Sequence, residues 1–361
     1  MGDRAIGRLG SKGERAMADD PSAHLRWDAE SLWRQLAPLL PRISVEVLAR
    51  CESTNSTLIE RARAAGGDPG APVTLPGALL ERPGETQGAA AVVDAASSSG
   101  DATDTAQGDE SEFTPLGRRD VDIEPCLLVA EQQTSGRGRM GRSWISAPGA
   151  SLTFSLALPL VPRDWSGLSL AVGLALADAL EPPDDAPPRI VLKWPNDLWL
   201  AGGETGAAKL GGILIETVSV GRRRMCVVGV GLNLLPLPPP LTEGVDAGHA
   251  CLQSLAPLAA EVVTAPAVLA RVVVPLVRAL QAFESDGFAP LAPAYARRDL
   301  LRGREVSTSL AHPAAGLSEG VDEEGALLLR ADGQMHRIVS GEVSVRPAGA
   351  SFANPRRAGA A

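Results

Sequence analysis

A short segment rich in glycine and arginine, Gly136-Arg137-Gly138-Arg139-Met140-Gly141-Arg142, constrains the fold of this chain more than any other feature. Its glycines match G-x-G-x-x-G, which binds dinucleotides when a strand precedes it and a helix follows it. Residues 126–131 (CLLVAE) do predict a strand. After the loop come Pro148 and Gly149, and then residues 151–158 predict a second strand. A strand–loop–strand arrangement argues against the Rossmann fold, because no helix N-terminus would meet the pyrophosphate.

The loop nevertheless has the chemistry of an anion clamp. Glycines leave its backbone N–H groups accessible, and guanidinium groups match the oxygens of phosphates and carboxylates. A solvated basic loop is the alternative. Only three of the 34 basic residues are lysines, and two of them, Lys193 and Lys209, lie inside polar motifs. A compact ammonium differs from a guanidinium fork, so these two positions are candidates for a required point charge.

Composition narrows the partners of the 361-residue chain. The formal net charge of −9 and the 3% aromatic content argue against a general nucleic-acid surface. The four cysteines show no metal-ligand spacing, which leaves any metal ligands unassigned and suits a reducing cytosol. No apolar run reaches the length of a membrane span, and the first residues lack an apolar signal core, so we expect a cytoplasmic protein. Met17 is an alternative start to Met1.

The pattern of apolar residues predicts an α+β chain with an all-β appendix. We expect helices over 23–40, 54–65, 166–180 and between 265 and 299, and strands over 45–51, 126–131, 151–158, 190–194, 210–216 and 225–232. Residues 303–346 alternate, with turns at 322–325 and 332–333, which predicts a small antiparallel barrel. Residues 81–122 are rich in Ala, Gly, Ser and Asp, and we expect a disordered insertion there. The expected divisions are a partly disordered N-terminal segment (1–44), a catalytic domain (45–298), the barrel (299–348) and a tail (349–361).

Several kinds of catalyst are missing from the polar motifs. The four histidines lie outside them, no G-x-S-x-G elbow or Walker loop occurs, and no cysteine has a basic setting. The motifs instead supply Arg, Lys, Asn, Gln, Asp and glycine backbone. Such groups suit positioning and charge stabilisation at a transferring phosphorus centre.

The order of these motifs resembles that of the biotin protein ligases. They are Glu52–Asn55, Glu131–Thr134 with the arginine loop, Lys193–Asp197, Lys209–Glu216, Gly229–Asn233 and the C-terminal Gly341–Arg346. The resemblance covers roughly residues 45–65 and 126–347. It implies a mixed or antiparallel sheet like that of class II aminoacyl-tRNA synthetases, followed by a small SH3-like barrel.

The resemblance also implies an activity. Biotin and ATP, with Mg²⁺ on the phosphates, would first give biotinyl-5′-AMP. The biotin would then pass to a lysine of an acceptor protein, the biotin carboxyl carrier domain of an acetyl-CoA or other acyl-CoA carboxylase. Lys209, Arg139 and Asp197 would be the catalytic residues, with Lys209 bridging the biotin carboxyl and the α-phosphate and Asp197 helping to deprotonate the acceptor lysine. The implied biotin contacts are Ser53, Thr54, Asn55, Gln133, Arg137, Gly138, Arg139 and Lys209. The implied nucleotide contacts are Arg142, Trp144, Lys193, Asn196 and Asn233.

The same residues also allow purely structural roles and other functions. The structural alternatives are helix capping by Ser53 or Thr54, a turn at Pro195–Asp197, core packing of Trp144 and strand termination at Asn233. A lipoate or octanoate ligase would share the fold, and some relatives repress transcription through an N-terminal helix-turn-helix. The segment before Val45 is short for such a module, so we expect a ligase without DNA binding, as a monomer or weak homodimer. A biotin carrier is excluded, because the chain has no Met-Lys-Met hairpin.

Overall fold

The computed structural model describes residues 25–66, 124–202, 206–220, 223–239, 241, 249–255, 263–339 and 345–347. The predicted disordered insertion (81–122), the predicted tail (349–361) and both candidate start positions lie outside the described residues, as does most of the C-terminal Gly341–Arg346 motif.

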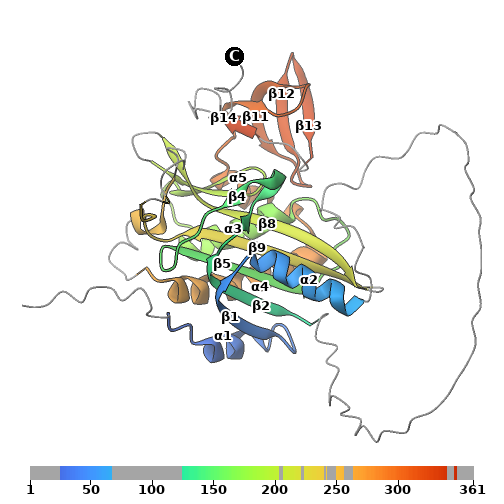
Figure 1. The fold of residues 1–361 in the computed structure, drawn as a ribbon. Coiled ribbons are helices and arrows are strands. Elements are labelled where there is room, and N and C mark those ends of the chain that lie inside the picture. The colour runs from blue at the N-terminus through green and yellow to red at the C-terminus, as the bar shows by residue number, and fades with distance from the viewer. Residues whose placement is uncertain are drawn as a thin grey trace, which may run out of the picture.

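A seven-stranded mixed sheet forms the body of the molecule (Figure 1). Its order is β1 (Ser44–Cys51), β2 (Cys126–Gln133), β5 (Ser151–Pro159), β9 (Arg223–Asn233), β8 (Ala207–Val220), β7 (Asp197–Ala201) and β6 (Ile190–Lys193). Strands β1 and β2 are parallel, and every other pair in this sheet is antiparallel. The predicted mixed sheet is therefore confirmed.

Helices cover both faces of this sheet, which explains the unbroken apolar run in β2. Leu128 packs in one cluster with Leu58 and Ile59 of α2 (Thr54–Gly66). Its neighbours Leu127 and Val129 belong to the main core on the other face. Successive side chains of a strand point to opposite faces, so a strand buried on both sides reads as continuous apolar sequence.

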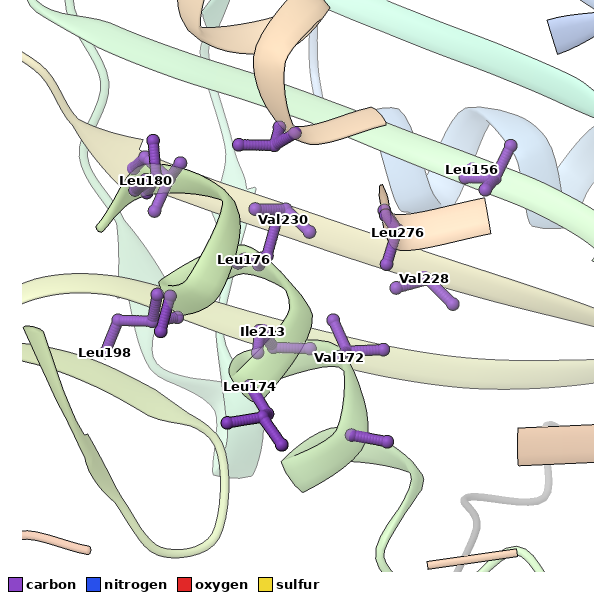
Figure 2. Close-up of a cluster of buried hydrophobic side chains, with 14 of the residues drawn as sticks. Leu156, Val172, Leu174, Leu176, Leu180, Leu198, Ile213, Val228, Val230 and Leu276 are labelled. Carbon is purple, nitrogen blue, oxygen red and sulfur yellow. The ribbon is translucent and has the colours of Figure 1, made fainter. Parts of the chain in front are cut away.

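Two long helices build the main core. Helix α3 (Leu168–Leu180) and helix α4 (Ala265–Asp286) pack against each other, and α3 also contacts β6, β7 and β8. Figure 2 shows Val172 and Leu176 of α3 among Ile213 of β8 and Val228 and Val230 of β9. This packing fixes β8 and β9, which carry the Lys209–Glu216 and Gly229–Asn233 motifs.

Helix α4 corrects one reading of the sequence. It has 22 residues and is long and apolar enough to cross a membrane by length and composition. One face of the helix, including Val272, Leu276 and Leu280, is buried in the core. Its apolar character is thus that of a core helix, followed by a short turn and α5 (Ala292–Arg298).

The five C-terminal strands form a separate antiparallel sheet, at the top of Figure 1. They are β10 (Glu305–Thr308), β11 (Ala315–Val321), β12 (Leu327–Ala331), β13 (Gln334–Ile338) and β14 (Val345–Pro347). The predicted turn at 332–333 joins β12 to β13, with positive φ at both Asp332 and Gly333. This small β domain packs on the large sheet. The contact includes Trp194, which follows β6 and is fully buried, and its Nε1 donates to the carbonyl of Gly325, between β11 and β12, at 3.1 Å.

The described part of the predicted N-terminal segment packs on the large sheet. Helix α1 (Ala29–Leu36) begins where the Asp28 carboxylate accepts from the Ser31 backbone N–H. Leu32 and Leu36 are buried in the main core, and Trp27 Nε1 donates to Glu131 Oε1 at 2.9 Å. The helix is shorter than the predicted 23–40. The proposed domain boundaries remain predictions.

Candidate functional site

The arginine loop is a two-stranded ribbon that stands over the large sheet. Strands β3 (Gly136–Arg137) and β4 (Ser143–Trp144) pair antiparallel around a short 3₁₀ turn. Met140 and Gly141 both have positive φ, 57° and 68°, and Gly is the residue that adopts this region at no cost. The absence of a helix after the loop confirms that G-x-G-x-x-G is not a dinucleotide fingerprint here.

Two adjoining hollows lie beneath and beside this loop. The smaller, of about 120 Å³, lies between the loop, the start of α2 and strands β8 and β9. The larger, of about 1160 Å³, extends from the loop to the small β domain, where Gly325 and Val339 line it. The smaller hollow holds nearly all of the predicted site residues, so we place the chemistry there despite its size. Its lining includes Ser53, Thr54, Asn55, Gln133, Arg137, Gly138, Arg139, Arg142, Trp144, Lys193, Asn196, Asp197 and Lys209.

The floor of the small hollow is a buried polar network. The Thr54 backbone N–H donates to Gln133 Oε1 at 2.7 Å, which ties the first residue of α2 to the end of β2. Ser155 Oγ lies 2.6 Å from both Thr54 Oγ1 and Asn55 Oδ1. Thr54 and Asn55 are each only 3% exposed. The floor therefore presents fixed hydroxyl and amide groups in a buried setting, where each unmet hydrogen bond is costly.

Ser53 immediately precedes helix α2 and caps its N-terminus. Its Oγ accepts from the Ser56 backbone N–H at 3.4 Å, and Thr57 Oγ1 donates to its carbonyl at 3.0 Å. The capping interpretation of Ser53 thus has a geometric basis, and the side chain also lines the hollow.

A carboxylate outside the predicted site, Glu216, lies under the floor. It is 2% exposed. Arg137 Nη2 donates to Glu216 Oε1 at 2.8 Å, and Asn55 Nδ2 donates to Glu216 Oε2 at 2.9 Å. One acid thus joins the arginine loop to the start of α2.

Two ammonium groups face one carboxylate on the wall of the hollow. Lys209 Nζ donates to Asp197 Oδ1 at 2.7 Å, and Lys193 Nζ lies 4.0 Å from Asp197 Oδ2. The Asp197 side chain is 12% exposed and that of Lys209 is 35% exposed. Lys209 is therefore exposed enough to meet a ligand, while Asp197 holds its ammonium group in place.

Arg139 points from the loop to the same wall. Its Nη1 donates to Asn196 Oδ1 at 3.2 Å, and Asn196 Nδ2 donates to the Ile213 carbonyl at 2.7 Å. The pKa of Arg139 is lowered, chiefly because the side chain is buried. The charge of Asp197 opposes this shift, and the nearby charge of Arg142 adds to it. A guanidinium next to a second cation and partly desolvated is well placed to gain from a bound anion.

Trp144 lies on Gly231 of β9. A Cβ at residue 231 would be 2.4 Å from indole Cε2 and 2.8 Å from Nε1, so only glycine leaves room for the ring. The indole Nε1 is buried and has no hydrogen-bond partner in the described part of the chain. The ring lines both hollows and offers a flat apolar surface between them.

Asn233 is the predicted site residue that lines neither hollow. Its Nδ2 donates to the carbonyl of Ala250 at 3.1 Å and, more weakly, to that of Lys209 at 3.3 Å. The side chain is 1% exposed, and its Oδ1 has no partner among the described residues. Asn233 holds the chain behind Lys209, and its contact with nucleotide stays a prediction.

Sequence reasoning missed three residues of this site. Ser155 reads as one more position of an apolar strand, and Glu216 was part of a motif without a role. His249 lies beside Lys209 and Asn233, and burial followed by the charge of Lys209 lowers its pKa. Nothing in the local sequence of these residues could have found them, since their partners are distant in the chain.

The residues that the structure describes do not form a metal cage. Within the described ranges no group of three or more His, Cys, Asp or Glu could hold a metal ion. The two carboxylates at the site, Asp197 and Glu216, are each paired with a cation. This donor set fits Mg²⁺ carried by nucleotide phosphates, where the ion would neutralise phosphate charge.

Comparison with known proteins gives two family matches. Residues 124–233 match the biotin/lipoate A/B protein ligase family, and residues 303–346 match the biotin protein ligase C-terminal domain. The first match includes the arginine loop and both lysines, and the second covers most of the small β domain.

Whole proteins and solved structures agree with these matches. The biotin–[acetyl-CoA-carboxylase] ligase of Mycobacterium tuberculosis is 35% identical over 232 residues, which cover 62% of this chain and 80% of that protein. The bifunctional ligase/repressor BirA of Escherichia coli is 35% identical over 61% of this chain and 66% of its own length. This chain thus spans just under two thirds of the ligase/repressor relatives. The structure of the Aquifex aeolicus biotin protein ligase in complex with biotin and ATP is 28% identical, with a TM-score of 0.50 over 62% of this chain and 89% of that one.

Proposed function

This chain belongs to the biotin protein ligase family, and from that premise we propose that it joins biotin to a lysine of a carrier protein at the cost of ATP. In the first step an oxygen of the biotin carboxylate attacks the α-phosphorus, the bond to the β-phosphate oxygen breaks, and pyrophosphate leaves. In the second step a lysine amine attacks the acyl carbon of biotinyl-5′-AMP. The amide forms, AMP leaves with the bonding electrons, and the amine gives up its proton.

The observation that carries this proposal is the meeting of two cations over a buried polar floor. Lys209 and Arg139 reach the same small hollow from β8 and from the arginine loop. Two anions that must react repel each other, and fixed cations between them reduce that repulsion as the transition state forms. Lys209 would bridge the biotin carboxylate and the α-phosphate, and Arg139 would bind the adenylate.

The floor supports biotin over lipoate as the acid. Thr54, Asn55 and Gln133 offer buried donors and acceptors that a ureido ring can satisfy with its N–H and C=O groups. The ring of lipoate has none of these groups. A site built to hydrogen-bond its substrate rejects an analogue that leaves those groups unpaired, by a factor on the order of 10⁴.

The remaining assignments concern the nucleotide and the acceptor. Trp144 would shield the adenine side of the nucleotide, and Arg142, Lys193, Asn196 and Asn233 remain our proposed nucleotide contacts. Asp197 would hold Lys209 and stand ready for the proton of the acceptor lysine. The acceptor would be the biotin carboxyl carrier domain of an acyl-CoA carboxylase. We propose cytoplasmic action as a monomer or weak homodimer, and no binding to DNA.

ATP–pyrophosphate exchange tests the first step. We expect label to pass from pyrophosphate into ATP when biotin is present, and only background exchange with lipoate or octanoate. Mass spectrometry of a purified biotin carboxyl carrier domain then tests the second step through the mass of one added biotin. Exchange with lipoate alone would contradict the proposal, and a gel shift with operator DNA would overturn the expectation of no DNA binding.

A further inference from the structure

Glu216 is a buried acid that the two-step reaction does not use. It lies in the middle of β8, opposite Val227 of β9, and is 2% exposed. On the same face of β8, Val218 and Val220 pack in the apolar cluster under α2. A carboxylate among such neighbours costs free energy unless charged and polar partners meet both of its oxygens. What those partners do therefore explains why an acid occupies this position.

The first partner belongs to the arginine loop. Arg137 Nη2 donates to Glu216 Oε1 at 2.8 Å, and Arg137 Nη1 reaches both Glu216 Oε2 at 3.4 Å and Ser56 Oγ at 3.2 Å. The Arg137 side chain is 46% exposed, whereas that of Glu216 is 3% exposed. The ion pair thus fastens a surface loop to the interior of the sheet. Because guanidinium and carboxylate meet as a fork, the contact fixes the direction of the loop as well as its distance.

The second partner belongs to the floor of the hollow. Asn55 Nδ2 donates to Glu216 Oε2 at 2.9 Å and to the Leu214 carbonyl at 3.1 Å, so both of its N–H groups are engaged. An ionised carboxylate only accepts hydrogen bonds, so it decides which end of the amide faces it. Asn55 must therefore turn Oδ1 toward Ser155 and the hollow. Glu216 in this way makes Asn55 an acceptor for a ligand N–H.

We infer that Glu216 is a positioning residue, which holds the arginine loop closed through Arg137 and sets Asn55 as an acceptor for the substrate. The role in substrate binding rests on the proposed function, whereas the role in holding the loop does not. Glu216 does not line the small hollow itself and acts through Arg137 and Asn55, which do. Its loss should weaken biotin binding through a looser loop and a misdirected amide, while Lys209 and Asp197 keep their contact.

The variant Glu216→Gln removes the charge of the side chain with little change of its shape, so it tests both the hold on the loop and the orientation of Asn55. Its carbonyl can still accept from Arg137, but its NH₂ group would face Asn55 Nδ2, donor against donor. Glu319→Gln is the control for the substitution itself. Arg330 Nε donates to Glu319 Oε1 at the same 2.8 Å in the small β domain, where the acid is more exposed (35% against 3%) and lines neither hollow. Circular dichroism and thermal melting establish that both variants are folded.

Hydrogen–deuterium exchange gives a readout that does not depend on activity. The loop is held by Gly138 N–H donating to the Arg142 carbonyl at 2.7 Å and by the pairing of Gly136 with Trp144. We expect these amides to exchange about tenfold faster in Glu216→Gln, since a hydrogen bond to a charged group is lost or weakened. Amides of the small β domain should be unchanged, and Glu319→Gln should leave the loop unchanged.

Kinetics of ATP–pyrophosphate exchange give the second readout. We expect Glu216→Gln to raise the KM for biotin about tenfold or more and to change kcat by only about twofold, because an interaction made equally in the ground and transition states acts on KM. Restored biotin KM in Glu216→Asp would support the role of charge.

Loop exchange that stays at the wild-type rate, or that rises equally over the whole large sheet, would overturn the inference. A KM for biotin that stays unchanged while kcat falls would overturn the claim that Glu216 sets Asn55 as an acceptor for the substrate. If the wild-type protein shows no biotin-dependent ATP–pyrophosphate exchange, the proposed function fails. Hydrogen–deuterium exchange of the loop amides still decides whether Glu216 holds the loop.

Discussion

Two glycines of β9 allow a direct test of where biotin and nucleotide bind. Gly229 and Gly231 lie two residues apart on one face of the strand. A Cβ at 229 would lie 2.2 Å from Asn55 Oδ1, and a Cβ at 231 would lie 2.4 Å from Trp144 Cε2. The same substitution, glycine to alanine, therefore displaces a different side chain at each position.

The size of each displacement follows from the geometry. Ordinary contact begins at 3.4 Å, so Asn55 must retreat by about 1.2 Å and Trp144 by about 1.0 Å. Asn55 cannot move this far and keep its bonds to Leu214, Glu216 and Ser155. Overpacking of this kind costs about 1–3 kcal/mol, which corresponds to a change of about 5- to 150-fold in an equilibrium constant.

Steady-state ATP–pyrophosphate exchange measures both effects. We expect Gly229→Ala to raise the KM for biotin at least about fivefold and to leave the KM for ATP nearly unchanged, and Gly231→Ala to do the opposite. Gly173→Ala, on core helix α3, is the control. Its Cβ would meet only the flexible methyl groups of Leu192 and Ile213, at 3.3 and 3.5 Å. If both active-site variants raised the same KM, or if Gly229→Ala bound biotin normally, Asn55 and Trp144 would not have the separate roles given to them.

Two further substitutions test the charges. Lys209→Arg should lower adenylate formation about 100- to 1,000-fold in rapid-quench assays, because a fork cannot replace the ammonium between two anions, and near-normal activity would refute that role. Burial raises the pKa of Asp299 from 3.8 to about 6, so the folded state favours the protonated acid. The free energy of unfolding therefore has its full contribution from this group below about pH 4 and loses it as the pH rises through 6. Urea unfolding should show a loss of up to about 3 kcal/mol over this range that is absent in Asp299→Asn, and an equal loss in both proteins would count against it.

Sequence patterns predict the framework well where one physical cause dominates. Cys126–Ala130 predicts a strand because both sides of β2 are buried and every position is apolar. The arginine loop predicts an anion clamp because its residue types fit few other purposes. The scarcity of lysine singled out Lys193 and Lys209, which the fold brings to the same carboxylate, Asp197.

The parts that sequence reasoning missed depend on contacts between distant segments. Strand β7 (Asp197–Ala201) was missed because it is short and follows a proline, and it forms only by pairing with β6 and β8. Asn55 and Glu216 are 161 residues apart, so no local pattern links them. His249 comes from a loop without periodicity, and only the fold brings it to Lys209.

The most direct test of the account is capture of the intermediate in the absence of any acceptor protein. The purified chain is mixed with biotin, Mg²⁺ and ATP labelled at the α-phosphate, freed of small molecules, and analysed after acid release. Because Lys209 and Arg139 would hold the two reacting anions and the loop would exclude water, we predict that about one labelled biotinyl-5′-AMP is retained per chain and that almost none is retained by Lys209→Ala. Wild-type protein that binds biotin and ATP yet yields no labelled adenylate would contradict the central claim.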